Sequence, residues 1–195
     1  MSLSLQCECG QVQGTVLTGH GYARATCYCA DCQAYARWLD QPGLTDAHGG
    51  TDLVAMNPSA VRFTAGEESI ACMSLSEKGL LRWYARCCRS PLANTPRDPK
   101  LAYVGIIADR LSPPQMVDAA FGPPGETVLN AGSAVGRVGT TPVTFLAGGL
   151  HIVGGILAAK LHGQAPTLFF DEQGHPLRDP QVLTPARRAR LQAGG

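Results

Sequence analysis

The pattern of polar and apolar positions in the first half of the chain predicts β-strands. In residues 11–17 (QVQGTVL) and 60–64 (AVRFT), apolar side chains alternate with polar ones, as in a strand with one buried face. Gly66, Glu67 and Glu68 follow the second of these runs and predict a turn. Both runs therefore predict strands that cover a core on one side only.

Further apolar runs extend this pattern toward residue 107. Residues 69–75 (SIACMSL) and 79–87 (GLLRWYARC) flank the segment 76–79 (SEKG), which is typical of a hairpin connection. Residues 101–107 (LAYVGII) predict another strand. We therefore expect residues 1–110 to form one β-rich domain, with the cysteine motifs at its strand ends and turns.

The composition changes after about residue 110, where prolines and glycines become dense. Residues 111–195 are therefore interpreted as an extension with Pro- and Gly-rich loops and one or two helices docked on the β-rich body. Thr184 followed by Pro185 predicts the start of a short basic helix, because threonine is a good helix cap and proline suits the first helical turn. The arginines of this helix are expected on a solvated face.

Residues 141–163 (TPVTFLAGGLHIVGGILAAKLHG) are largely apolar and, if helical, long enough to span a bilayer. Several glycines and the central His151 argue against a membrane span. At helical spacing a stripe of apolar side chains would lie on one side: Phe145, Ile152, Ile156 and Leu157. We favour a helix docked on the body, and attachment to a membrane is the alternative.

The overall composition narrows the class of protein. With 195 residues, of which 45% are hydrophobic and 16% charged, the chain can bury a core and does not have the composition of a disordered protein. A net charge of +1 gives no electrostatic footprint for nucleic acid. The start, MSLSLQCECG, lacks the basic and apolar regions of a signal peptide. We therefore expect a cytoplasmic protein whose thiols stay reduced.

The eight cysteines form three groups and one single residue. The groups are a C-x-C at Cys7 and Cys9, a C-x-C-x-x-C at Cys27, Cys29 and Cys32, and the adjacent pair Cys87 and Cys88. Cys72 lies alone inside a predicted strand and is interpreted as a small buried apolar residue. Eight cysteines in this length fall short of the roughly 8–10% that is typical of a disulfide scaffold.

Cys27, Cys29 and Cys32, called the three-cysteine group below, are interpreted as a zinc site. A C-x-x-C in a reducing compartment is typical of either a redox pair or a zinc site. The redox motif needs its first cysteine at a helix start within a βαβ unit, and the sequence around residues 27–32 shows no such alternation. Zinc needs only a tight turn that directs the sulfur atoms to one point about 2.3 Å away.

Taken in order, the segments CECGQV at 7–12, CYCADC at 27–32 and RCCRSPL at 86–92 resemble the glutathione-dependent formaldehyde-activating enzyme family, whose domain is shared with centromere protein V. The resemblance covers about residues 3–110. It implies a mainly β fold of packed antiparallel sheets, a β-tent, with two zinc sites. In the family the C-x-C-x-x-C binds the catalytic zinc, and the early C-x-C joins a later C-x-x-C-G around a structural zinc.

The chain departs from this pattern at the later motif. If Cys88 matches the second cysteine of that motif, the first falls on Ala85, and Cys87 is the nearby replacement. Arg89 stands where the family has a glycine that serves a tight turn. Adjacent cysteines point to opposite sides of a strand, so both reach one metal only if the chain turns sharply. A second zinc site is therefore either incomplete or formed by the four-cysteine group: Cys7, Cys9, Cys87 and Cys88.

The number of ligands in the three-cysteine group suggests its chemistry. Three thiolates leave one open position on a tetrahedral zinc, which is typical of a catalytic site. Their net charge with zinc is −1, which favours a soft substrate thiolate over activation of water. The resemblance implies a carbon–sulfur lyase or synthase that forms or cleaves S-hydroxymethylglutathione from formaldehyde and glutathione, with Cys27, Cys29 and Cys32 as the catalytic residues.

Two other classes of function remain open on the sequence. One is a non-catalytic zinc-binding module with a binding or scaffold role, in which a protein side chain occupies the fourth position. The other is a protein of either kind that is attached to a membrane by residues 141–163. The expected partner is a small-molecule thiol or thiol adduct, and neither nucleic acid nor a membrane is expected to bind.

Overall fold

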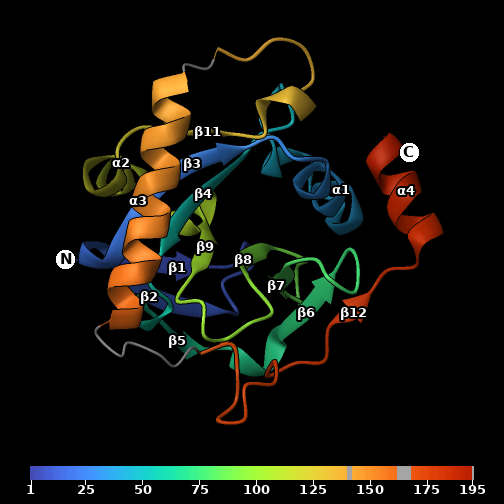
Figure 1. The fold of residues 1–195 in the computed structure, drawn as a ribbon. Coiled ribbons are helices and arrows are strands. Elements are labelled where there is room, and N and C mark those ends of the chain that lie inside the picture. The colour runs from blue at the N-terminus through green and yellow to red at the C-terminus, as the bar shows by residue number, and fades with distance from the viewer. Residues whose placement is uncertain (140–141, 162–167, 195) are drawn as a thin grey trace.

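The computed structural model describes residues 1–139, 142–161 and 168–194, but not the side chains of 142–148 and 160–161. Two β-sheets form the body, and helices surround it (Figure 1). The prediction of a mainly β protein with antiparallel sheets and helices in the C-terminal part is confirmed.

The smaller sheet contains four antiparallel strands in the order β10-β1-β2-β5. Their bounds are Leu111–Ser112 for β10, Ser2–Gln6 for β1, Gln13–Leu17 for β2 and Val61–Ala65 for β5. The two alternating runs of the sequence therefore form neighbouring strands. Gly14 and Val16 of β2 are buried while the residues at the two ends of this strand are exposed, as the alternation predicts.

The larger sheet has the order β11-β3-β4-β9-β8-β7-β6-β12. The strand bounds are Val128–Leu129 (β11), Gly21–Cys27 (β3), Thr51–Met56 (β4), Val104–Ile107 (β9), Pro91–Thr95 (β8), Leu81–Ala85 (β7), Ile70–Ser74 (β6) and Gln181–Val182 (β12). Only the edge strands β11 and β12 pair in parallel, and the other pairs are antiparallel. The predicted hairpin of residues 69–87 is β6–β7, and the predicted strand of residues 101–107 contains β9.

The α-helices are α1 (Ala30–Leu39), α2 (Pro114–Phe121), α3 (Pro142–Leu161) and α4 (Pro185–Ala193). Short 3-10 helices lie at Thr18–His20, Pro42–Leu44, Pro58–Ala60, Glu67–Ser69, Ala108–Arg110 and Ala131–Ser133. The predicted turn begins at Gly66, whose φ of 71° is a conformation that favours glycine. Thr184 caps α4 by accepting a hydrogen bond from the N–H of Arg187, so the predicted start of this helix is confirmed.

Two hydrophobic clusters hold these layers together. One lies between the two sheets and includes Leu5 of β1 together with Trp83 and Ile106 of the larger sheet. The other lies between the opposite face of the larger sheet and α1, where it includes Trp38 and Ile107. Adjacent residues of one strand thus enter different clusters, because side chains alternate across a sheet. This alternation places the side chains of the candidate site on the α1 side.

The chain beyond residue 110 adds to both sheets. β10 forms one edge of the smaller sheet, and β11 and β12 form the two edges of the larger one. Phe169 is buried between the sheets, with its ring centroid 4.9 Å from that of Trp83. Edge strands that receive a further strand no longer expose unpaired N–H and C=O groups. The C-terminal part therefore supplies strands and core residues as well as helices.

The helix expected within residues 141–163 is α3, which packs against β3 (Figure 1). Ile152 and Ile156 of the predicted stripe are half-buried, whereas Leu157 is 56% exposed, so its place in the stripe was wrong. The side chain of Phe145 and the ends of the predicted segment lie outside the described residues. A methyl group on Gly155 would lie 2.2 Å from the ring of Tyr22, so this close approach requires glycine.

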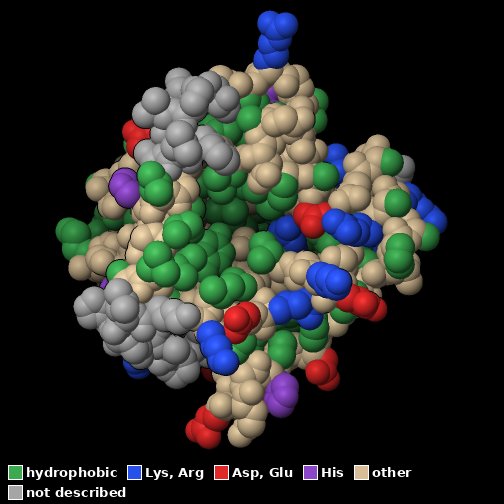
Figure 2. Space-filling model, viewed as in Figure 1, with side chains coloured by type: hydrophobic (Ala, Val, Ile, Leu, Met, Phe, Trp, Pro, Cys, Tyr) green, Lys and Arg blue, Asp and Glu red, His purple; other side chains and the backbone are tan. Residues whose placement is uncertain are grey.

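Residues 149–159 of α3, whose side chains the structure describes, expose mainly apolar side chains. In Figure 2, hydrophobic side chains gather where this helix lies. Leu150 and Val153 are 68% and 54% exposed. Within the described residues, no helix combines the length and the apolar character that crossing a membrane requires.

Candidate metal centres

The four-cysteine group forms where two tight turns meet. Cys7 and Cys9 lie in the turn between β1 and β2, where the N–H of Gly10 donates to the Cys7 carbonyl over 3.0 Å and Gly10 has a φ of 78°. Cys87 and Cys88 lie in the turn between β7 and β8, which the hydrogen bond from Ala85 N–H to the Ser90 carbonyl closes at 2.8 Å. The chain therefore turns at the adjacent cysteines, as one metal site would require.

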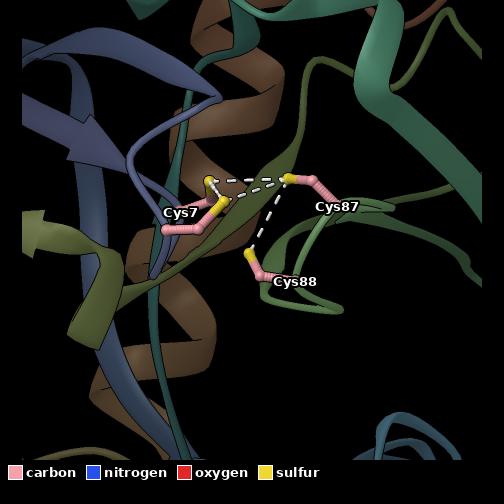
Figure 3. Close-up of side chains that lie close together, drawn as sticks. Cys7, Cys87 and Cys88 are labelled. Atoms are coloured by element: carbon pink, nitrogen blue, oxygen red, sulfur yellow. Dashed lines mark hydrogen bonds between the residues drawn. The ribbon is translucent and has the colours of Figure 1, made fainter.

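The sulfur atoms of this group lie at the spacing of a metal site. The Sγ atoms of Cys7 and Cys9 are 3.6 Å apart, and Cys87 Sγ is 3.3 Å from Cys9 Sγ, 4.0 Å from Cys7 Sγ and 3.8 Å from Cys88 Sγ. All four lie within 4.8 Å of one another. Four sulfur atoms at about 2.3 Å from one zinc are about 3.8 Å apart. In Figure 3 the labelled Cys7, Cys87 and Cys88 point toward one another. The group is therefore able to hold a metal ion.

The turn of residues 86–90 lowers the pKa of one of its cysteines, Cys88. Burial raises the pKa of Cys88, but hydrogen bonds from the Ser90 hydroxyl and from the N–H groups of Cys9 and Ser90 outweigh it and lower the pKa to about 6. Desolvation, and then hydrogen bonds with Cys9 and Cys88, raise the pKa of Cys87 to about 12. A metal ion that binds here therefore meets an ionised Cys88 and displaces the proton of Cys87.

Arg89 adopts a backbone conformation that favours glycine. Its φ is 58°, in the left-handed region. Its guanidinium group donates from Nε to the Leu39 carbonyl over 3.0 Å and from a terminal nitrogen to the Trp38 carbonyl, and it lies 4.8 Å from the Trp38 ring centroid. These carbonyls end α1, where a helix has no internal donors for them. Arg89 thus connects the turn of the four-cysteine group to the helix of the three-cysteine group.

The three-cysteine group spans a strand end and a helix start. Cys27 ends β3, and Cys29 is the N-cap residue of α1, with its sulfur accepting a hydrogen bond from Cys32 N–H over 3.3 Å. The three sulfur atoms lie within 4.8 Å of one another. Cys27 and Cys32 are buried, and Cys29 is half-buried. The hydrogen bond with Cys27 lowers the pKa of Cys29, but its hydrogen bond with Cys32 and its burial outweigh this effect and raise the pKa.

Helix α1, which begins directly after Cys29, was not predicted from the sequence. β3 precedes the group, α1 follows it, and β11 pairs in parallel with β3. The signal was present in the sequence, because Ala34, Tyr35, Trp38 and Leu39 have helical spacing and all are buried. The strand that follows α1 along the chain, β4, pairs antiparallel with β3, so β3 and α1 do not belong to a βαβ unit. The argument against a redox pair is therefore confirmed, although the helix itself was missed.

Two residues that the sequence analysis missed contact these sulfur atoms. Both terminal nitrogens of the Arg82 guanidinium group lie 3.8 Å from Cys32 Sγ, and Asn130 Nδ2 donates to Cys27 Sγ over 3.5 Å. Arg82 is 4% exposed and lies over the Tyr35 ring, 4.9 Å from its centroid. Its position between Leu81 and Trp83 in an apolar run is a signal that sequence reasoning can use.

The buried charge of Arg82 has no carboxylate partner in the part of the chain that the structure describes. Burial opposes the charged form, but the neighbouring Cys32 and Tyr35 keep the pKa of Arg82 above its usual value. The pKa of Cys32 is raised, first by its hydrogen bond with Cys27 and then by burial, although Arg82 acts against this. Thiolates in the three-cysteine group would supply the counter-charge that the buried guanidinium group lacks.

Asp31, which lies between Cys29 and Cys32 in the sequence, contacts the C-terminal helix α4. Arg188 and Gln192 of α4 donate to Asp31 Oδ1 over 2.9 and 2.7 Å. The expectation that the arginines of this helix lie on a solvated face is therefore wrong for Arg188, while Arg187 and Arg190 are exposed. The interpretation of Cys72 as a small buried apolar residue is confirmed, because this residue is 3% exposed in the core between the sheets.

Histidines supply no fourth ligand among the described residues. The metal-ligating side chains near the three-cysteine group are its own three cysteines. His48 Nδ1 lies 2.8 Å from the Val135 carbonyl oxygen, and His151 is an exposed residue of α3. A metal ion held by Cys27, Cys29 and Cys32 therefore keeps one position for a ligand from outside these residues.

Comparisons with known proteins place the chain in a family without assigning an activity. A model of a family of unknown function, DUF6151, matches residues 1–195. The chain belongs to the DUF6151 family. No curated protein matches this DUF6151 member. A crystal structure of a Rhodobacter sphaeroides protein is similar over 67% of this chain and 100% of its own, with 19% sequence identity and a TM-score of 0.45. The resemblance to the formaldehyde-activating enzymes stays a prediction from the sequence motifs.

Proposed function

We propose that the chain is a zinc-dependent enzyme that makes or breaks the carbon–sulfur bond of a thiol–aldehyde adduct such as S-hydroxymethylglutathione. The three-cysteine group supplies three of four ligands. A sulfur-rich set with an open position suits zinc in a catalytic role. When bound, zinc would hold the sulfur of the substrate as a thiolate. The choice of glutathione and formaldehyde as substrates rests on the resemblance of the sequence motifs. The choice of metal ligands rests on the geometry of the three cysteines.

The observation that carries the proposal is the buried guanidinium group of Arg82 beside Cys32. Zinc with three thiolates has a net charge of −1, and one arginine makes the centre neutral. An additional thiolate then binds at a lower electrostatic cost than it would at an uncompensated anionic centre, because charges interact strongly when they are buried. Arg82 therefore favours a centre that accepts a thiolate substrate.

The four-cysteine group is proposed to hold a second, structural zinc. Its four ligands leave no open position, so it has no place for a substrate. It joins two turns about 80 residues apart, so a metal ion bound there would cross-link distant parts of the chain. The proposal therefore gives the two groups different roles.

The test compares the parent with Cys29→Ser. Serine replaces a soft thiolate by a poorly ionised hydroxyl, so zinc content should fall by about one ion per chain and turnover of formaldehyde with glutathione should disappear. Cys72→Ala removes a buried thiol outside both groups and should keep both zinc and turnover. Zinc per chain and formaldehyde consumption are measured on all three proteins.

Two outcomes would contradict this proposal. If Cys29→Ser keeps the full zinc content, the three-cysteine group is not the metal centre. If a zinc-loaded parent neither binds nor turns over any thiol, the centre is not an enzyme of this class. A non-catalytic zinc-binding module with a binding or scaffold role is then the better description.

A further inference from the structure

A row of polar groups crosses the larger sheet beside the three-cysteine group. Arg82 of β7 is paired directly with Asn94 of β8, and Asn94 is paired with Gly105 of β9. Directly paired residues of antiparallel strands project from the same face of a sheet. The Arg82 side chain reaches Cys32 of α1, so this is the face that α1 covers. Asn94 therefore belongs to the surroundings of the candidate metal centre.

Two polar atoms converge over Gly105. A methyl group on this glycine would lie 2.8 Å from Asn94 Oδ1 and 2.9 Å from the hydroxyl oxygen of Tyr103. Any other residue at position 105 would push these groups apart. Burial, and then the negative charge of Cys27 and Cys32, raises the pKa of Tyr103, so its hydroxyl group stays protonated and able to donate a hydrogen bond.

Asn94 is buried with an unused acceptor. It is 3% exposed, and its Oδ1 atom has no hydrogen-bond partner among the described residues. A buried amide oxygen without a donor destabilises a fold, so such atoms point to a function or to a ligand that supplies the donor. The guanidinium group of Arg82 is directed to Cys32 Sγ and does not donate to Asn94 Oδ1. The missing partner is a group with an O–H or N–H.

We propose that Asn94 and Tyr103 bind the oxygen of the thiol–aldehyde adduct whose sulfur is held at the three-cysteine group, an inference that rests on the function proposed above. The hydroxyl of a hydroxymethyl group both accepts and donates a hydrogen bond. It accepts from the Tyr103 hydroxyl and donates to Asn94 Oδ1. A free thiol has no such oxygen, so the pair distinguishes the adduct from the thiol alone.

The same two residues act during bond formation. An electron pair of the thiolate sulfur forms the carbon–sulfur bond, the π pair of the aldehyde carbonyl moves onto its oxygen, and this oxygen takes a proton from water. Tyr103 donates its hydrogen bond to the oxygen as negative charge develops there and keeps its own proton. Asn94 accepts the hydrogen bond of the resulting hydroxyl. Cleavage of the adduct follows the same steps in reverse.

The test uses Tyr103→Phe and Asn94→Leu, with Tyr84→Phe as the matched control. Tyr84 lies on the same face of the larger sheet, in β7, among the residues packed on α1. Binding of glutathione alone is followed by the visible spectrum of the cobalt-substituted protein, and adduct formation is followed by NMR exchange with formaldehyde. Thermal unfolding is recorded for each variant.

Tyr103→Phe should lower kcat about 100-fold, as does the loss of one donor to a developing oxyanion. Asn94→Leu should lower kcat/KM about tenfold, as expected for a single hydrogen bond between uncharged groups. Both should keep the affinity for glutathione within about twofold, because the metal ligands are unchanged. Asn94→Leu should also unfold at the same or a higher temperature, since it removes an unpaired buried polar group. Tyr84→Phe should match the parent.

Turnover within about twofold of the parent for both variants would overturn the inference and leave the proposed function in place. A lower unfolding temperature for Asn94→Leu with unchanged kinetics would assign Asn94 a structural role and overturn it as well. A parent that shows no change of its cobalt spectrum with glutathione and no turnover would overturn the proposed function and this inference together.

Discussion

The two cysteine groups differ in how far apart their members lie along the chain. Cys27, Cys29 and Cys32 fall within six positions, at the end of β3 and the start of α1. Cys7 and Cys87 are 80 positions apart and meet through two separate turns. A metal ion in the first group orders a short segment, whereas one in the second closes a long loop. A metal ion in the second group should therefore stabilise the fold more than one in the first.

The two cysteine groups also differ in how deeply they are buried. The three-cysteine group is largely buried and has a buried arginine against it. In the four-cysteine group, Cys9 and Cys87 are exposed. Water can solvate the charge of an exposed thiolate centre, but a buried centre needs a counter-charge within the protein. Arg82 lies where it could supply this counter-charge, with its terminal nitrogens 3.8 Å from Cys32 Sγ.

The largest expected effect comes from breaking the cross-link. Cys87→Ser should lower the free energy of unfolding by about 4 kcal/mol, the value for a cross-link that closes a long loop. Cys29→Ser should lower it by about 1 kcal/mol, since its loop is only a few residues long. Urea unfolding of zinc-loaded proteins measures both. Equal losses for the two variants would remove the distinction between the groups.

A second effect sharpens the comparison of charge. Arg82→Met should lower the zinc affinity of the three-cysteine group about 10–100-fold, as loss of a neighbour of metal ligands does. The affinity of the four-cysteine group should not change. Competition with a chelator, on Cys87→Ser and Cys29→Ser backgrounds that isolate each group, measures this. Arg82→Lys keeps the charge, so its zinc affinity should fall less than that of Arg82→Met. An unchanged affinity in Arg82→Met would show that the guanidinium group does not balance the thiolates.

The smallest expected effect concerns the ion pair between Asp31 of α1 and Arg188 of α4. Arg188→Ala removes the ion pair with Asp31. The side chains of Arg188 and Asp31 are 36% and 28% exposed, so the free energy of unfolding should fall by only about 0.5 kcal/mol. The matched variant Arg190→Ala removes an exposed arginine of the same helix and should cost nothing measurable. Thermal unfolding at low and high salt separates them. The Arg188→Ala difference should shrink at high salt, and a difference that persists would exclude an ionic origin.

Local patterns were sufficient for much of the body. The alternation in β2, the connection between β6 and β7 and the cap at Thr184 were predicted from a few neighbouring residues, and each was confirmed. These features depend on contacts within one element or one turn, whose physics is contained in a short window of sequence. The three-cysteine group could also be recognised from a short window of sequence, because its members lie within six positions. Helix α1 was also within reach of such reasoning but was missed.

What only the tertiary structure decided depends on pairings between distant segments. The meeting of Cys87 with Cys7 and Cys9 follows from how two turns pack, and Arg89 supplies the left-handed residue that the sequence motif assigned to glycine. The register of β7, β8 and β9 places Arg82 and Asn94 on the side of α1, and a shift by one residue would place them on the other face. Such register is set by the packing of the whole sheet, so the sequence determined the ligands while the fold determined their surroundings.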